Sequence, residues 1–236
     1  MLKGGKRSFK IVVFATEENI YARGLLEKLL KEKIKIEAMI IEKGSEASRN
    51  SKNFLKNDFW NPPSLSKIIG KNKIRAYYTK DQNNEYCFNK LKLLSPDLIL
   101  IGGGRILKKR IINTAKIGVL NCHPGLLPEY RGMDVAGWAI YNGDDIGVTC
   151  HFIDEGVDTG PVLMRKKAEW GRKGDTLLKI RIKLQKLCID TMIKCIKLLE
   201  EGTIKAIAQK GEGKRYFRMS PETIKEVENI IKSVQN

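Results

Sequence analysis

Short apolar runs rich in β-branched residues alternate with helical patterns along the first half of the chain. The run Phe9–Ala15 reads FKIVVFA, as expected for a strand that is buried on both faces. From Asn19 to Lys31 the apolar residues recur at helical spacing, and Lys35–Ile41 returns to a strand pattern. A strand, a helix and a strand in this order predict a βαβ unit, which implies a parallel sheet.

The alternation continues along the rest of the chain. Further strands are predicted at Ile74–Thr79, Asp97–Gly103, Gly118–His123, Gly147–Ile153 and Pro161–Lys167. Helices are predicted at Asn84–Leu94, Lys108–Asn113, Asp134–Tyr141 and Asp175–Glu201, and after Pro221. The polar stretch Glu42–Pro63 is interpreted as a long surface loop with one helical turn. The sequence therefore predicts an α/β fold with a mostly parallel, doubly wound central sheet.

Length and composition favour a globular protein. A chain of 236 residues can bury one substantial core, and 42% hydrophobic with 30% charged residues is typical of a soluble domain. The first apolar run after the basic N-terminus, Ile11–Ala15, is shorter than the apolar region of a signal peptide, and no stretch is long enough to span a bilayer. We expect a cytoplasmic protein without a membrane partner.

The cysteines indicate reduced thiols. They are odd in number, scattered, and never spaced as C-x-x-C: Cys87, Cys122, Cys150, Cys188 and Cys195. This pattern argues against a disulfide framework and against a structural zinc site, so we expect no metal.

The net charge of +17 suits an anionic small substrate or a nucleic acid. In the predicted helix Asp175–Glu201, however, the lysines follow one stripe and the apolar residues another, as on an ordinary solvated helix face. A solvated, lysine-rich surface is the favoured interpretation. A basic nucleic-acid-binding module remains the alternative that is not an enzyme.

The stretch VLNCHPGLLPEYRG contains the strongest candidate for catalysis. Residues two apart on a strand share a face, so Asn121 and His123 point the same way and Cys122 points toward the core. They stand at the carboxyl end of a parallel strand, where open α/β sheets bind ligands. An amide and an imidazole there can stabilise a developing oxyanion, and the histidine can also move a proton.

A carboxylate that orients this imidazole or stabilises its positive charge is expected in the loop IDEGVDTGP, which directly follows a predicted strand. The loop carries Asp154, Glu155 and Asp158, and spacing alone leaves all three open. The second histidine, His151, lies in the preceding strand on the same face as Thr149, and we interpret it as structural rather than catalytic.

Together, LNCHPGLLPEYRG and GVTCHFIDEGVDTGPVL resemble the signature of formyltransferases that use 10-formyltetrahydrofolate. This family includes glycinamide ribonucleotide, methionyl-tRNA and sugar N-formyltransferases, and the resemblance extends over Phe9–Lys167. It implies a Rossmann-like formyltransferase fold with a more mixed C-terminal half and helices on both faces of the sheet. The family's catalytic Asn, His and Asp fall on Asn121, His123 and Asp158.

The resemblance also implies a mechanism. An acceptor amine attacks the formyl carbon carried on N10 of the folate, and Asn121 and His123 hold the oxygen of the tetrahedral intermediate. Asp158 pairs with the imidazole and helps, through a water, to take the proton of the amine. The formyl donor is thus 10-formyltetrahydrofolate, and the acceptor is a primary amine.

Two segments are implied to line the folate pocket. GGGRILKK aligns with the family segment whose backbone contacts the pterin, which assigns Arg105, Ile106 and Leu107 to the pocket. The facing residues implied by the resemblance are Asp154, Glu155, Gly156 and Val157, together with Asp158. From composition alone, the glycine run is better interpreted as an ordinary strand-to-helix turn. It is not a dinucleotide fingerprint, because G-x-G-x-x-G is incomplete.

The acceptor is predicted from two departures from the family pattern. The stretch Ala15–Arg23 is acidic and carries no glycine before its predicted helix, whereas the glycinamide ribonucleotide enzymes have a phosphate-binding loop. The residues after Lys167 are interpreted as too few for the extra tRNA-binding domain of the methionyl-tRNA enzymes. We therefore predict a catalytic domain over residues 1–205, with a tail and helix over 206–236 packed on it or extending from it.

A small amine, specifically an amino sugar, is the favoured acceptor. A methionyl-tRNA enzyme without its C-terminal domain, a glycinamide ribonucleotide-type enzyme and a formyltetrahydrofolate hydrolase remain alternatives. A tRNA partner is not favoured, and a homodimer is left open.

Overall fold

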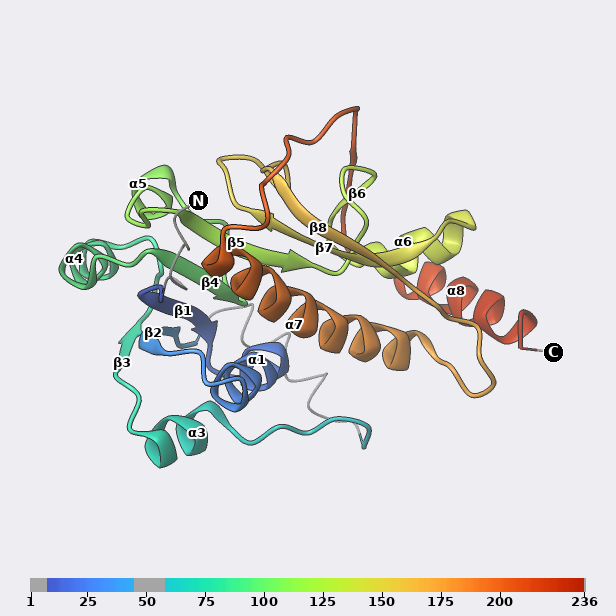
Figure 1. Ribbon diagram of the computed structural model, residues 1–236. Coiled ribbons are helices and arrows are strands. Elements are labelled where there is room, and N and C mark those ends of the chain that lie inside the picture. The colour runs from blue at the N-terminus through green and yellow to red at the C-terminus, as the bar shows by residue number, and fades with distance from the viewer. Residues whose placement is uncertain (1–7, 45–57, 236) are drawn as a thin grey trace. The chain divides into compact units, whose positions relative to one another are not determined.

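The computed structural model describes residues 8–44 and 58–235, which form two compact units (Figure 1). The first unit comprises the described residues up to 121 together with 193–205, and the second comprises residues 122–192 and 206–235. The predicted surface loop Glu42–Pro63 includes residues 45–57, which lie outside the described residues.

The first unit contains a parallel sheet. Its strands are β1 (Ile11–Thr16), β2 (Ile36–Glu42), β3 (Ala76–Thr79), β4 (Leu98–Gly102) and the start of β5 (Gly118–His123). The hydrogen-bonded order is β3-β2-β1-β4-β5, and every one of these pairs is parallel. Every residue of β1 is buried, which explains its unbroken apolar run, because both faces of the strand are covered. The parallel arrangement confirms the α/β prediction.

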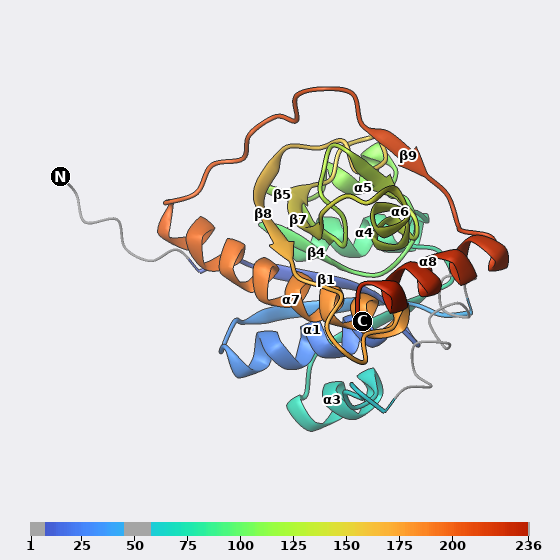
Figure 2. The ribbon, with the colours of Figure 1, turned by 90° about the vertical axis from the view of Figure 1, so that its right-hand side faces the viewer.

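Helices cover both faces of this sheet, as predicted. The helices are α1 (Ile20–Lys31), α3 (Leu65–Asn72), α4 (Glu85–Leu94) and α5 (Lys109–Ile112). Figures 1 and 2 show α1 and α3 on one face and α4 and α5 on the other. Asn19, Ser64 and Asn84 begin α1, α3 and α4 as N-caps whose side chains accept backbone N–H bonds. The sequence pattern did not predict α3, because its eight residues are too few for a clear helical period.

The second unit is mixed, which agrees with the expected C-terminal half. It contains β6 (Tyr130–Gly132), α6 (Val135–Asn142), β7 (Ile146–Phe152), β8 (Val162–Ala168), most of α7 (Leu177–Glu201), β9 (Lys214–Tyr216) and α8 (Pro221–Ser233). The end of β5 is followed in strand order by β7 and then β8. Strands β7 and β8 are antiparallel, with Thr149 opposite Arg165.

The C-terminal segment packs within the second unit. Strand β9 pairs in parallel with β6, and α8 contacts α6 (Figure 2). Gly132 has φ +96, and a Cβ there would lie 2.3 Å from the carbonyl oxygen of Tyr216, so the pairing requires glycine. The Trp138 Nε1 donates to the carbonyl of Phe217 at 2.8 Å. The sequence did not predict β6 and β9, because three-residue strands have no readable period.

Candidate active site

The carboxyl end of β5 carries the residues that the sequence singled out. Asn121 is half-buried there, and the His123 residue is 4% exposed. Cys122 is buried, and none of the five cysteines, all of which lie in described segments, forms a disulfide. The strand therefore ends on an amide and an imidazole, while the thiol between them lies in the core.

The hydrogen bond of His123 identifies which ring nitrogen can exchange a proton. Its Nε2 lies 2.8 Å from the carbonyl oxygen of Tyr130. Because a carbonyl can only accept, Nε2 carries a hydrogen, and Nδ1 is the nitrogen that gains or loses a proton. Nδ1 lies 3.5 Å from Oδ2 of Asp158. A Cβ on Gly125 would lie 2.8 Å from Nε2, so the loop after β5 can approach the ring only as glycine.

Asp158 is held in place by the backbone around it. It has a left-handed conformation with φ 55, and its Oδ2 accepts a hydrogen bond from Gly132 N at 2.9 Å. Gln209, from the C-terminal segment, donates Nε2 to the carbonyls of Asp158 and Gly160 at 2.9 and 2.8 Å. A Cβ on Gly160 would lie 1.9 Å from the carbonyl oxygen of Phe152. The sequence VDTG thus produces a tight loop that fixes the carboxylate.

His151 lies on the other side of the same carboxylate. Its Nε2 is 3.6 Å from Asp158 Oδ1, and its Nδ1 donates to the Phe152 carbonyl at 2.9 Å. The residue is 1% exposed, and burial lowers the pKa of its imidazole to about 4 although Asp158 opposes the shift. His151 is therefore neutral near pH 7. The sequence offered one signal for this contact, since both histidines occur in the last two residues of their strands.

The three side chains form an arrangement that can move a proton. Asp158 lies between two imidazoles at ion-pair distance, and Nδ1 of His123 can accept a proton whose charge the carboxylate stabilises. The amide of Asn121 stands two residues before His123 on the same strand and can supply a neutral hydrogen-bond donor. A buried, charge-stabilised imidazole beside an amide donor is suited to acyl-transfer chemistry.

The Asp154 side chain holds the loop before Asp158 in its conformation through two hydrogen bonds. Oδ1 of Asp154 accepts from Gly156 N at 3.0 Å and from Thr159 Oγ1 at 2.6 Å, which closes the turn. Glu155 and Gly156 are exposed, and Val157 is half-buried. The assignment of these residues to a folate pocket stays a prediction. Oδ1 of Asp154 is thus used within the loop itself.

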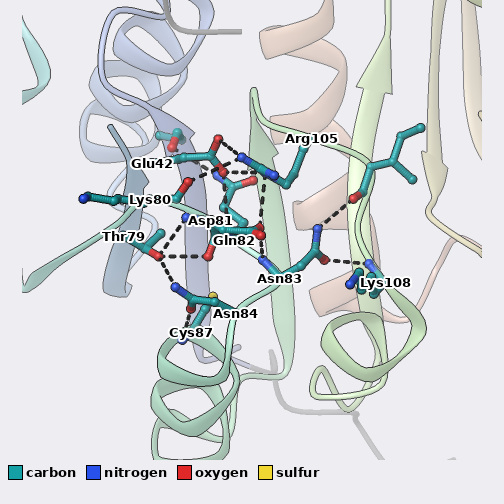
Figure 3. A network of polar contacts seen from close by, with 12 residues as sticks. Glu42, Thr79, Lys80, Asp81, Gln82, Asn83, Asn84, Cys87, Arg105 and Lys108 are labelled. Atoms are coloured by element: carbon teal, nitrogen blue, oxygen red, sulfur yellow. Dashed lines mark hydrogen bonds and ion pairs between the residues drawn. The ribbon is translucent and has the colours of Figure 1, made fainter. Parts of the chain in front are cut away.

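The other predicted folate segment belongs to the first unit. The guanidinium of Arg105 contacts Glu42 and Asp81, and the hydrogen bonds with Glu42 raise its pKa (Figure 3). Ile106 is 62% exposed, whereas Leu107 is buried. The side chain of Arg105 is therefore engaged within the protein. The assignment of Arg105, Ile106 and Leu107 to a folate pocket stays a prediction.

The described residues contain neither a candidate metal cluster nor a helix suited to cross a membrane. Within residues 8–44 and 58–235, no three His, Cys, Asp or Glu side chains come together as a metal site. No helix in those segments is both long and apolar enough to cross a membrane.

Relatives with curated functions share much of this sequence. A methionyl-tRNA formyltransferase of Clostridioides difficile (strain 630) is 26% identical over 95% of this chain and 73% of its own length. The methionyl-tRNA formyltransferase of Thermodesulfovibrio yellowstonii is 34% identical over 64% of this chain. That alignment covers 49% of the Thermodesulfovibrio enzyme, so the chain spans about half the length of this relative.

Solved structures with low sequence identity share the fold. A 4-N formyltransferase from Francisella tularensis aligns with a TM-score of 0.65 and 18% identity, over 97% of this chain and 87% of that one. The formyltransferase PseJ from Anoxybacillus kamchatkensis aligns with a TM-score of 0.52 and 21% identity, over 88% and 85%. The latter was solved with UDP-4,6-dideoxy-4-formamido-L-AltNAc and tetrahydrofolate.

A family model described as formyl transferase matches residues 9–196. This range contains β1 to β8, the Asn121–His123 strand end and the Asp158 loop. The chain therefore belongs to the formyl transferase family, whose members are enzymes that transfer one-carbon groups.

Proposed function

We propose that the protein transfers a formyl group from 10-formyltetrahydrofolate to a primary amine of a small acceptor, with Asn121, His123 and Asp158 as its catalytic residues. One observation carries the proposal. Nδ1 of the buried His123 faces Asp158 Oδ2 at 3.5 Å, while its Nε2 is bound to the Tyr130 carbonyl. The ring is thus oriented for proton transfer at a single nitrogen.

The residues divide the chemistry between them. As the acceptor nitrogen bonds to the formyl carbon, the carbonyl oxygen becomes an oxyanion, which the Asn121 amide and the His123 imidazolium stabilise. Asp158 stabilises the charge on His123 and, through a water, receives the proton that the amine loses. The bond from the formyl carbon to N10 then breaks, and N10 takes up a proton from His123 Nδ1. The proton held by Asp158 then passes to Nδ1 of His123, which restores both residues. One proton has left the acceptor nitrogen and one has reached N10.

The neutral state of His151 supports this division of roles. If both imidazoles were charged, Asp158 would be shared between two cations and would stabilise His123 less. Burial keeps His151 neutral at pH 7, so the negative charge of Asp158 acts mainly on His123. Neutral His151, whose proton is on Nδ1, therefore does not compete with His123 for the charge of Asp158.

An amino sugar is the acceptor that we favour. The Francisella protein is named a 4-N formyltransferase, and the Anoxybacillus formyltransferase was solved with a nucleotide-linked formamido sugar; both folds align with most of this chain. The N-terminus of α1 argues against a phosphate-bearing acceptor held at that helix. Asn19 already accepts from the N–H groups of Tyr21 and Ala22, and the carboxylates of Glu17 and Glu18 precede it.

Methionyl-tRNA is the second candidate acceptor. The curated relatives reported above carry that activity in their names and are 26% and 34% identical to this chain. The net charge of +17 would also favour a polyanionic acceptor.

An acceptor screen tests the proposal. The purified chain is incubated with 10-formyltetrahydrofolate and nucleotide-linked amino sugars, charged initiator tRNA or glycinamide ribonucleotide, and formylated products are measured by mass spectrometry. We expect turnover with an amino sugar, and a loss of about 10²–10³ in kcat for His123→Ala, because a group that stabilises the oxyanion and moves a proton is removed.

The matched control is Asp145→Asn, which removes an exposed carboxylate that pairs with Lys167. We expect its kcat to remain at the wild-type value. A folded His123→Ala variant with wild-type kcat would overturn the catalytic assignment, and the absence of turnover with every acceptor would overturn the function.

A further inference from the structure

Asn83 holds the main chain on both sides of Leu107. Its Nδ2 donates to the Ile106 carbonyl at 3.0 Å, and its Oδ1 accepts from Lys108 N at 2.7 Å (Figure 3). A neighbouring parallel strand binds the C=O and N–H groups on either side of one residue in a similar way. Residues 104–108 lie in neither a helix nor a strand, so the Asn83 carboxamide takes the place of a strand partner.

The turn that carries Asn83 is itself tightly bonded. Asn83 N donates to Asp81 Oδ1 at 2.7 Å, and Thr79 Oγ1 accepts from Asp81 N at 3.1 Å. Gln82 Nε2 donates to the Ala15 carbonyl at 3.1 Å, which ties the turn to β1. The Asn83 side chain is therefore preorganised, and little conformational entropy is lost in keeping it on the segment 106–108.

An ion pair with the buried carboxylate of Glu42 fixes the residue before this segment. Glu42 is 1% exposed, and its two carboxylate oxygens accept from Arg105 Nη2 at 2.7 Å and Nε at 2.9 Å. Gln82 N also donates to Glu42 at 3.1 Å. Bidentate pairing of this kind imposes geometry as well as energy. It directs the guanidinium into the network of Figure 3.

Glycines let the turn after β4 pack directly on these side chains. Gly103 has φ +97, and a Cβ there would lie 2.2 Å from Asn19 Nδ2. A Cβ on Gly104 would lie 2.2 Å from Gln82 Oε1. The glycine run therefore serves close packing, which brings the following residues within reach of Asn83.

From these contacts we infer that Asn83 is a positioning residue for the formyl donor. This inference rests on the proposed function. Neighbouring peptide groups of an extended chain face opposite sides, so Asn83 leaves the N–H and C=O of Leu107 to a ligand. The exposed side chain of Ile106 lies beside them. One donor, one acceptor and an apolar surface suit the edge and face of a pterin ring.

The inference is tested by comparing donor kinetics in Asn83→Ala with those of the wild type. Losing both side-chain bonds should let residues 106–108 change shape, which we expect to raise the KM for 10-formyltetrahydrofolate about tenfold. The kcat at saturating donor and the KM for the acceptor should stay within about twofold. A residue that only stabilised the fold would not raise the donor KM alone.

The matched control is Asn72→Ala. Asn72 also donates its side-chain amide to a backbone carbonyl, that of Ile68 at 2.8 Å, but lies outside the network around Asn83. It should leave the donor KM unchanged. If Asn83→Ala fails to fold, Asn83→Asp takes its place, because it keeps the acceptor for Lys108 N and loses the donor to Ile106. It should raise the donor KM as well.

Hydrogen exchange gives a readout that needs no activity. The Lys108 amide should exchange faster in Asn83→Ala and stay protected in Asn83→Asp. An active Asn83→Ala enzyme with an unchanged donor KM, or unchanged exchange at Lys108, would overturn the role of Asn83. The absence of wild-type turnover with 10-formyltetrahydrofolate would instead overturn the proposed function on which that role rests.

Discussion

Glu42 and Asp158 are both carboxylates shielded from solvent, yet their surroundings differ. Among the described residues, Glu42 receives three hydrogen bonds of 2.7–3.1 Å, from Arg105 and Gln82 N. Among the same described residues, Asp158 receives one such bond, from Gly132 N. Its carboxylate oxygens lie 3.5 Å from His123 Nδ1 and 3.6 Å from His151 Nε2. The first carboxylate is saturated with donors, and the second keeps capacity for a further partner.

The basic side chains beside the two carboxylates also differ in their ability to change charge. Arginine stays protonated at every pH where the protein folds, and its planar fork matches both oxygens of Glu42. An imidazole can gain and lose a proton, so His123 can change charge during a reaction, whereas burial keeps His151 neutral near pH 7. A saturated carboxylate beside a permanent cation maintains shape, whereas an unsaturated one beside titratable rings can take part in chemistry. Removing the charge of each carboxylate should therefore have opposite consequences.

The largest expected effect comes from Asp158→Asn. The amide keeps the size of the side chain but cannot stabilise a positive charge on His123. We expect kcat for formyl transfer to fall about 10²–10³-fold, which corresponds to about 3–4 kcal/mol of activation free energy. The free energy of unfolding, measured with urea, should change by less than about 1 kcal/mol, since one hydrogen bond from Gly132 N is affected. A variant with wild-type kcat and a strongly lowered stability would reverse the comparison.

The second effect is a pH dependence of stability due to His151. Its pKa is about 4 in the folded protein and 6.5 in the reference state, so the unfolded chain binds more protons between these values. Stability should therefore be complete above about pH 6.5 and decrease as the pH falls toward 4, by about 3 kcal/mol from this group. The charges of Asp158, His123 and Asp154 also act on the ring.

The variant His151→Gln isolates this contribution. Its amide can still donate to the Phe152 carbonyl but carries no titratable proton, and the neighbouring groups are the same in both proteins. Urea unfolding at pH 7, 6, 5 and 4 should show that the wild type loses about 3 kcal/mol more than the variant. Equal losses in the two proteins would mean that burial does not keep His151 neutral.

The sequence was sufficient for those parts of the fold that have a long period or a continuous apolar run. The strand Gly118–His123 was predicted with the bounds that the structure gives it, because a short apolar run ends there at a Pro/Gly loop. The helix α3 and the β6–β9 pair were not predicted, since eight or three residues give too little periodicity. The β6–β9 pair also joins Tyr130 to Lys214, a separation that no local pattern encodes.

The candidate site divides in the same way. Asn121 and His123 could be paired from spacing, because two residues on one strand share a face. Spacing could not choose among Asp154, Glu155 and Asp158, and the choice of Asp158 came from the family resemblance. The contact between His151 and Asp158 was missed, because it depends on a tight loop with a left-handed residue. The bonds from Asn83 to Ile106 and Lys108 likewise depend on tertiary packing.

The smallest expected effect comes from Glu42→Gln and completes the comparison. Loss of the charge leaves Arg105 without its bidentate partner, and removing one member of a buried ion pair typically costs about 3–5 kcal/mol. Because the Arg105 side chain is 39% exposed, water can partly replace the carboxylate, and we expect a loss of about 2 kcal/mol in the free energy of unfolding. The kcat at saturating donor should remain within about twofold, in contrast to Asp158→Asn. Glu85→Gln, which removes an exposed carboxylate paired with Arg110, is the control and should change stability by less than about 0.5 kcal/mol. A fall in kcat as large as that of Asp158→Asn would show that donor saturation does not separate structural carboxylates from reactive ones in this protein.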